Sequence, residues 1–227
     1  ETENLTDTVE PPEPVGEPEG TILVISLDRG EGRYDSQTSA VEYAAILEAR
    51  FKVEIWSTSL DGPLDSESLL DYDLIIWSFG DFEVEDALEE EEADALLMVM
   101  FGEIPFVMSG AYVGGSGLEA VQSDVQNSDT GHAVADGFDI GEVIQFVDTL
   151  SGAQYETGVI EEPGEGEGTV ILVRGPGSEE AGAPAVVVQE DEFTGTRLGF
   201  IGFPLYLLPE DAQTRLVLNM VDWVLAP

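Results

Sequence analysis

The run at residues 21–27 (TILVISL) is apolar without interruption. Such a run is typical of a strand at the centre of a parallel sheet that is covered on both faces. The next segment, 39–51, has its apolar residues at the spacing of an amphipathic helix. Apolar strands and helices then alternate along the chain: strands at 52–58, 73–79, 104–109 and 197–203, a short helix near 66–70, and long helices over 82–101 and 210–225. This alternation predicts an α/β fold with a doubly wound, mostly parallel, flavodoxin-like sheet.

The middle of the chain has a different pattern. Short apolar runs there are separated by turn-rich stretches such as EEPGEGEG and GPGSEEAGAP. Short strands bounded by glycine and proline are typical of hairpins and sheet edges. We therefore expect added antiparallel or edge strands at 145–149, 155–160, 169–174 and 185–189.

Residues 1–20 contain four prolines and seven acidic residues but few apolar ones, a composition that predicts an extended, solvated linker or tail. We therefore expect a single α/β domain over 21–227. The tail suits a tether, although residues 5–9 can instead add a strand to a neighbouring sheet. It also contains a glycosylation sequon at Asn4, whose use the sequence leaves open.

The chain is strongly acidic, with 48 Asp and Glu residues against 7 Lys and Arg and a net charge of −41. Such a surface repels nucleic acid and anionic membranes, and it is typical of high-salt proteomes and of some secreted proteins. The chain has no cysteine and begins without methionine. No apolar run approaches the ~20 residues that span a bilayer. We predict an exported product, located outside the cell or at its surface.

The segment 104–115 (IPFVMSGAYVGG) is a buried strand that runs into a glycine-rich turn. In α/β enzymes such a turn lifts a nucleophile out of the sheet. The apex here is Tyr112. Its ring either caps the sheet by packing or lines a ligand or partner pocket at the carboxyl ends of the strands.

Three patterns occur in order along the chain: GAYVG at 110–114, GHAVADGF at 131–138, and GFIGFPL at 199–205 followed by PEDAQTRLVLNMVDWVL. Together they resemble the class I glutamine amidotransferase-like superfamily, which has a flavodoxin-like fold. The first is similar to the Gly-x-Cys-x-Gly elbow of that superfamily. The second resembles the His-Pro-Ile/Val-x-x-Gly segment of trehalose-utilisation-like proteins and of accessory domains of secreted peptidases. The third resembles the closing strand and helix of those accessory domains.

The resemblance also implies which catalytic groups are missing. Enzymes of the superfamily carry cysteine at the elbow, where this chain has Tyr112. They carry histidine, proline and an acid after the closing strand, where this chain has Phe203, Pro204 and Leu205. The resemblance therefore implies a catalytically degenerate domain with no catalytic residues, because the thiolate and its base are both replaced.

Other polar residues follow the predicted strands. Asp28 and Arg29 end the first strand, and Ser78 and Asp81 lie at the end of the third. These ends meet near Tyr112 in a doubly wound sheet, so we place a ligand or partner pocket there. Asp28 and Asp81 can supply oxygen ligands to Ca²⁺ or Mg²⁺. Alternatively, Asp28 pairs with a nearby arginine and Asp81 caps the following helix. No other cofactor is predicted.

His132 is the only histidine of the chain. It either holds a turn through a hydrogen bond or contributes to a ligand or metal site. A lone histidine without a spaced partner favours neither a zinc site nor a catalytic triad.

Three functions are compatible with these observations. The first is a non-catalytic binding or structural module of an exported, highly acidic protein, which binds a protein partner or self-associates. The second is a self-assembling surface or filament subunit whose N-terminal tail contacts a neighbour. The third is a carboxylate- or metal-dependent enzyme with its site at the carboxyl ends of the strands.

Overall fold

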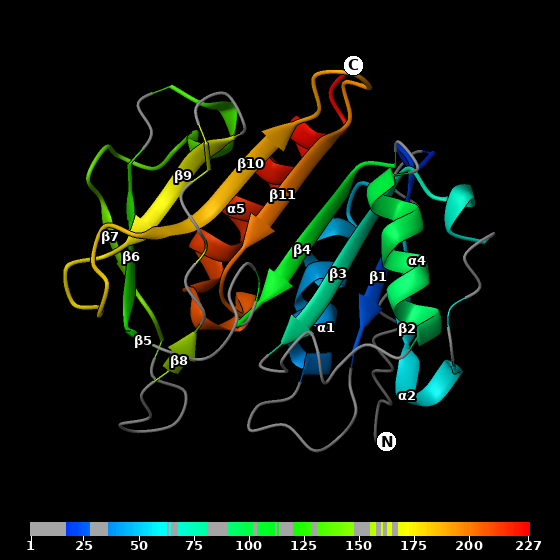
Figure 1. Cartoon of the computed structure of the whole chain (residues 1–227), viewed down its shortest axis with the longest axis horizontal. Coiled ribbons are helices and arrows are strands. Elements are labelled where there is room, and N and C mark those ends of the chain that lie inside the picture. Colours follow the sequence, from blue (N-terminus) through cyan, green and yellow to red (C-terminus); the bar gives the residue numbers. More distant parts are fainter. Residues whose placement is uncertain are drawn as a thin grey trace, which may run out of the picture.

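A computed structural model describes residues 17–27, 36–62, 64, 68–80, 90–101, 104–111, 113, 120–128, 131–147, 155–157, 160, 163–164 and 168–227. Their central element is a nine-stranded sheet with helices on both faces (Figure 1). Most of the predicted tail lies outside the described residues, so the domain boundary at residue 20 stays a prediction.

One half of the sheet is parallel, as the apolar runs predict. Its strands lie in the order β2-β1-β3-β4-β11. All seven residues of β3 are buried, as expected for a strand covered on both faces. The bounds are Thr21–Ser26 for β1, Lys52–Ser57 for β2, Leu74–Gly80 for β3, Phe106–Gly110 for β4 and Arg197–Ile201 for β11.

The other half continues as β10-β9-β6-β7 with antiparallel pairing, which confirms the strands expected at 169–174 and 185–189, whereas β7 begins two residues before the strand expected at 145–149. A separate two-stranded sheet pairs β5 with β8. The sequence did not predict β5 or β6, because both are too short to show a periodic apolar pattern. The bounds are Ala120–Gln122 for β5, Asp124–Asn127 for β6, Val143–Gln145 for β7, Tyr155–Thr157 for β8, Thr169–Arg174 for β9 and Pro184–Glu190 for β10.

Helices α1 (Ser36–Leu47) and α5 (Glu210–Val224) pack on one face of the sheet, and α4 (Glu90–Phe101) packs on the other (Figure 1). Each face buries its own apolar cluster. The short helical turns are α2 (Thr58–Asp61), η1 (Ser68–Asp71), η2 (Ala133–Ala135) and η3 (Leu205–Leu207). Within the described ranges, no helix is both long enough and apolar enough to cross a membrane.

One acidic side chain near the start of α4 is buried. Glu92 is only 3% exposed. It precedes the buried residues Ala95, Leu96 and Val99 at spacings of three, four and seven. Helical periodicity therefore places it on the face that packs against the sheet.

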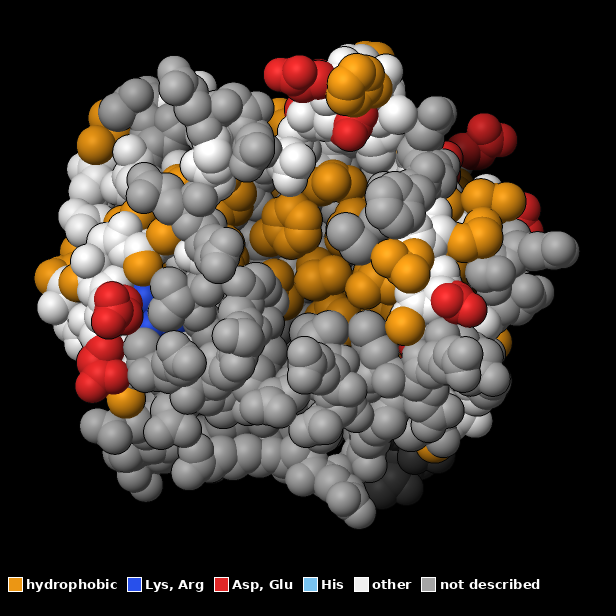
Figure 2. Space-filling model, in the orientation of Figure 1, with side chains coloured by type: hydrophobic (Ala, Val, Ile, Leu, Met, Phe, Trp, Pro, Cys, Tyr) orange, Lys and Arg blue, Asp and Glu red, His pale blue; other side chains and the backbone are white. Residues whose placement is uncertain are grey.

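Hydrophobic side chains also gather near the centre of the face that carries α4 (Figure 2). Leu198 and Phe200 of β11 are partly buried against the cluster beneath α4. The ring of Phe200 meets that of Phe106 edge-on, with a centroid distance of 5.9 Å. These contacts extend the α4-side core towards the junction of the two halves of the sheet.

Candidate functional site at the carboxyl ends of the parallel strands

Four serines form one row across the parallel half of the sheet. Ser26 of β1 pairs with Ser57 of β2 on one side and with Ser78 of β3 on the other. Ser78 in turn pairs with Ser109 of β4. Residues paired in register point to the same face of a sheet, so the row lies on one face. All four serines are buried.

The row lies where ligands commonly bind in folds of this type. The order β2-β1-β3-β4 places β1 between β2 and β3, so the direction of winding reverses between β1 and β3. Ligands of open α/β sheets bind outside the carboxyl ends of the strands at such a switch point. Ser26 is the last residue of β1, and Ser78 lies two residues before the end of β3. Both therefore lie at the carboxyl edge of the strands that flank the switch point.

Two of the four serines in the row have buried hydroxyl groups without hydrogen-bond partners. Neither Ser26 nor Ser78 has a partner for its Oγ atom, and both residues are 0% exposed. Helix α1 adds the unpartnered hydroxyls of Ser39 and Tyr43, which lie four residues apart and so on the same face of the helix. Ser109 differs, because its Oγ donates to the carbonyl oxygen of Phe203 at 3.4 Å. Buried polar groups normally make hydrogen bonds, so several buried hydroxyls without partners in one place require an explanation.

The surroundings of these hydroxyls disfavour charge. Burial raises the pKa of Tyr43 far above its usual value; the nearby Ser109 hydroxyl partly opposes the rise, and the charge of Glu42 adds to it. The phenol of Tyr43 lies near the Ser109 hydroxyl but makes no well-formed hydrogen bond to it. Burial also raises the pKa of the half-buried Glu42 carboxyl to about 7. The Oε2 atom of Glu42 has no hydrogen-bond partner.

Only part of the predicted pocket can be placed. Ser78 lies in the row at the switch point. Tyr112, Asp28, Arg29 and Asp81 lie outside the described residues, so their convergence and the Asp28–Asp81 metal site stay predictions. Among the residues that the structure describes, no group of three or more His, Cys, Asp or Glu side chains can hold a metal ion.

The start of the glycine-rich turn does lie within the described residues. Gly110 ends β4 with φ at +155° and packs directly against β3. A Cβ atom at this position would lie 2.8 Å from the Cβ of Phe79 and 2.9 Å from the carbonyl oxygen of Gly80. Ala111 then donates its N–H to the same Gly80 carbonyl at 2.6 Å. The first glycine of the turn is therefore required by the close packing of two strand ends.

His132 lies far from the serine row, near the amino ends of the parallel strands. Its Nδ1 accepts from the N–H of Val134 at 3.2 Å and caps η2, and its ring packs against Trp223 with a centroid distance of 5.1 Å. Trp223 lies beside Arg197, which starts β11 and donates to the Trp223 carbonyl at 2.9 Å. This contact places His132 near the amino ends of the parallel strands. His132 therefore caps a turn in the structure and lies away from Ser78.

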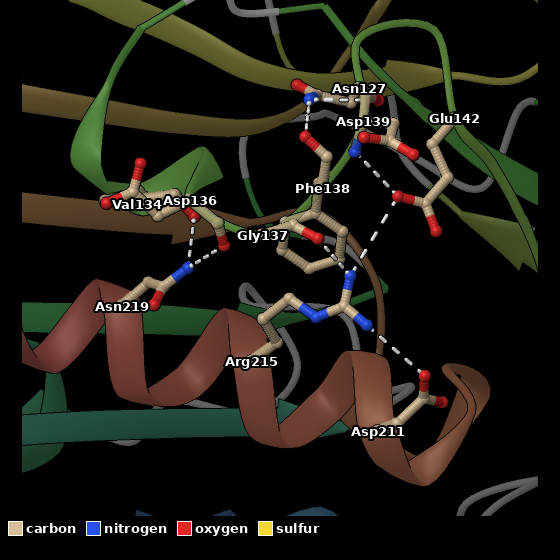
Figure 3. Close-up of polar contacts among 10 residues, drawn as sticks. All are labelled: Asn127, Val134, Asp136, Gly137, Phe138, Asp139, Glu142, Asp211, Arg215 and Asn219. Atoms are coloured by element: carbon tan, nitrogen blue, oxygen red, sulfur yellow. Dashed lines mark hydrogen bonds and ion pairs between the residues drawn. The ribbon is translucent and has the colours of Figure 1, made fainter.

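The segment that contains His132 is held on α5 by two side chains (Figure 3). Arg215 donates to the carbonyl of Gly137 at 2.6 Å, and its guanidinium lies 4.6 Å from the ring centroid of Phe138. Asn219 donates to the carbonyls of Val134 and Asp136 at 3.2 and 2.7 Å. The second sequence pattern is therefore a docking segment for the closing helix, which sequence reasoning did not predict.

The third pattern follows β11 and contributes to the core. Phe203 and Leu205 are both 0% exposed. Pro204 between them is also buried, and the ring of Phe203 packs against Phe146 with a centroid distance of 5.3 Å. These positions are filled by apolar packing, and their side chains have no group that can accept a proton.

Comparison with known proteins extends the fold assignment. No protein-family profile and no curated protein sequence match the chain. Three solved structures are similar in fold. A ThuA-like protein from Bacteroides uniformis has a TM-score of 0.60 at 13% identity, and the match covers 95% of both chains. The mmIFT52 N-terminal domain has a TM-score of 0.58 at 11% identity, covering 91% of this chain and 98% of the other.

The third similar structure is PurLQS from Thermotoga maritima, with a TM-score of 0.55 at 16% identity, covering 89% of this chain and 98% of the other. At these identities the matches establish the fold and no more. The chain therefore has the class I glutamine amidotransferase-like, flavodoxin-type fold.

Proposed function

We propose that this chain is a non-catalytic binding module with an amidotransferase-like fold, part of an exported and highly acidic protein. The observation that carries the proposal is the sequence and packing after β11. Phe203 and Leu205 are fully buried where the superfamily enzymes carry a histidine and an acid. The chain also has no cysteine to serve as nucleophile. Acyl transfer of the superfamily type needs both groups.

A binding role is favoured over a purely structural one by the hydroxyls at the switch point. In a purely structural domain, each buried polar group without a partner lowers the free energy of unfolding and stabilises nothing else. Ser26, Ser39 and Ser78 all retain such groups, and Ser26 and Ser78 lie at the carboxyl edge of the strands, beside which α/β sheets bind ligands. The proposed location outside the cell rests on the net charge of −41 alone.

The absence of catalysis can be tested by ammonia release from glutamine and by hydrolysis of an activated ester. We expect no turnover by the full chain above the rate without protein, at low salt and at about 2 M NaCl, where charge repulsion is screened. Turnover that is abolished by Ser109→Ala or Tyr112→Phe would contradict the proposal. Turnover unchanged by both substitutions would indicate a contaminating enzyme, which a second purification can remove.

A further inference from the structure

The unpartnered buried atoms of the described residues are concentrated at one place. Seven such side-chain atoms occur, and five of them belong to the serine row or to α1. The other two, on Trp77 and Gln122, lie elsewhere: Trp77 belongs to the cluster beneath α4, and Gln122 pairs within the small second sheet. Buried polar atoms without hydrogen-bond partners in native proteins mark unseen waters, ions or ligands, or strained functional sites.

We propose that the hydroxyls of Ser26, Ser78, Ser39 and Tyr43 form the floor of a site for a small neutral molecule whose own hydroxyl groups both donate and accept hydrogen bonds. This inference rests on the proposed binding function and names the chemistry of its ligand.

The spacing of the serines suits a shared ligand hydroxyl. Neighbouring strands lie about 4.8 Å apart, so the paired Ser26 and Ser78 are separated by about that distance. A ligand oxygen between them can make a hydrogen bond of about 2.7 Å to each Oγ. A serine hydroxyl rotates freely and can donate or accept. The pair therefore matches a hydroxyl group, which also does both.

The charges around the row argue against an ionic ligand. A buried anion needs a cation or several donors, and the described cations are all occupied elsewhere. Their partners are Glu19 and Asp222 for Arg50, Glu54 for Lys52, Thr157 for Arg174, Glu190 for Arg197, and Asp211 for Arg215. The Glu42 carboxyl beside Tyr43 already has its own ionisation disfavoured by burial. A bound cation would need carboxylate ligands that the row does not contain.

Binding must also open the edge of the sheet, because Ser26 and Ser78 are both 0% exposed. The binding-competent state is then a minor population, and the apparent affinity falls by that fraction. We therefore expect dissociation constants of order millimolar for a small probe.

The test uses the full, isotopically labelled chain titrated with erythritol, a neutral polyol, and separately with erythronate, its carboxylate counterpart. We expect saturable changes in the backbone amide signals of Ser26 and Ser78 with erythritol. Erythronate should bind at least about tenfold more weakly, because none of the described residues supplies a free cation for its charge. The Ser26→Ala/Ser78→Ala variant should lose at least about tenfold in erythritol affinity, because it removes both hydrogen-bonding hydroxyls.

The matched control is Ser128→Ala, which removes a hydroxyl bonded to the carbonyls of Val170 and Ile171 in the antiparallel half. It should leave the erythritol response unchanged. A response that is linear in erythritol, or equal in the double variant, would show only a general solvent effect and overturn the inference. Equal or tighter binding of erythronate would overturn the neutral-ligand assignment. None of these results alters the ammonia-release assay, so the two proposals fail separately.

Discussion

Replacing Ser26 or Ser78 with alanine is expected to stabilise the ligand-free protein. Each serine is 0% exposed, and its Oγ has no hydrogen-bond partner. An unsatisfied buried polar group costs about 1–3 kcal/mol. Alanine keeps the Cβ atom and removes only the oxygen, and the void of about 10 Å³ that it leaves costs about 0.2 kcal/mol. We therefore expect each single substitution to raise the free energy of unfolding by about 1 kcal/mol.

This gain is measurable by thermal and urea unfolding followed by circular dichroism. At this chain length, 1 kcal/mol corresponds to a rise in Tm of about 2–4 °C. The two sites are neighbours, so the double variant should gain less than the sum of the single ones. Measurements belong in polyol-free buffer, because any ligand that satisfies the hydroxyls would reduce or reverse the effect.

Ser109→Ala is the matched control, since Ser109 lies in the same row but donates to the Phe203 carbonyl. Its loss should lower the free energy of unfolding by about 0.5–1 kcal/mol, because a weak hydrogen bond disappears and a buried carbonyl loses its donor. If Ser26→Ala and Ser78→Ala destabilise the protein as much as Ser109→Ala does, the hydroxyls are satisfied in the native state. Such a result would refute the inference that the Ser26 and Ser78 hydroxyls lack hydrogen-bond partners.

Three further predictions concern other parts of the chain. Arg215→Ala should lower the free energy of unfolding by about 2 kcal/mol in urea unfolding, since it removes the charged hydrogen bond to Gly137 and the contact with Phe138; an effect no larger than that of Arg215→Lys would contradict this role. Burial raises the pKa of Glu42 in the folded protein from its usual value of 4.5 to about 7. The contribution of Glu42 to stability is therefore complete below about pH 4.5 and is lost as pH rises through about 7. Glu42→Gln should therefore flatten the fall in Tm between about pH 5 and about pH 8, and an unchanged slope would exclude Glu42 as its source. Finally, Tm should rise from about 0.05 to about 2 M NaCl because a net charge of −41 is increasingly screened, and a flat or falling Tm would count against self-repulsion.

The sequence predicts the parallel half of the sheet well because β1 and β3 are long apolar runs and the edge strand β2 largely alternates polar and apolar residues. It fails at β5 and β6, whose residues AVQ and DVQN carry no usable periodicity. These strands form because they pair with neighbouring strands: β6, for example, pairs with β7 on one side and with β9 on the other. Helix α1 lies three to four residues earlier than predicted, because the prediction followed the apolar spacing and not the N-cap residue types Asp35 and Ser36.

The candidate site was only partly predictable. The runs TILVIS and KVEIWS both end in serine, and the serines of β3 and β4 occur at similar points in their own runs. That repetition can be seen in the sequence, but the strand register that makes a row of it cannot. The docking of the 131–142 segment on Arg215 and Asn219 joins residues about 80 positions apart, and no local pattern encodes such a contact.

The extent of the serine row separates a binding site from an accident of packing. The same layer continues onto β11, where Ile201 pairs with Ser109 and is 0% exposed. The layer is therefore polar across β2, β1, β3 and β4 and becomes apolar at the fifth parallel strand. An apolar residue fits this layer on β11, so burial at the carboxyl edge does not by itself require serine. Polarity is confined to the strands around the switch point, where a ligand can contact it. Retaining orphaned hydroxyls there lowers stability, which is the usual consequence of keeping a site ready for binding. If Ser26→Ala stabilises the protein and the double variant loses polyol binding, the same hydroxyls lower stability and support binding.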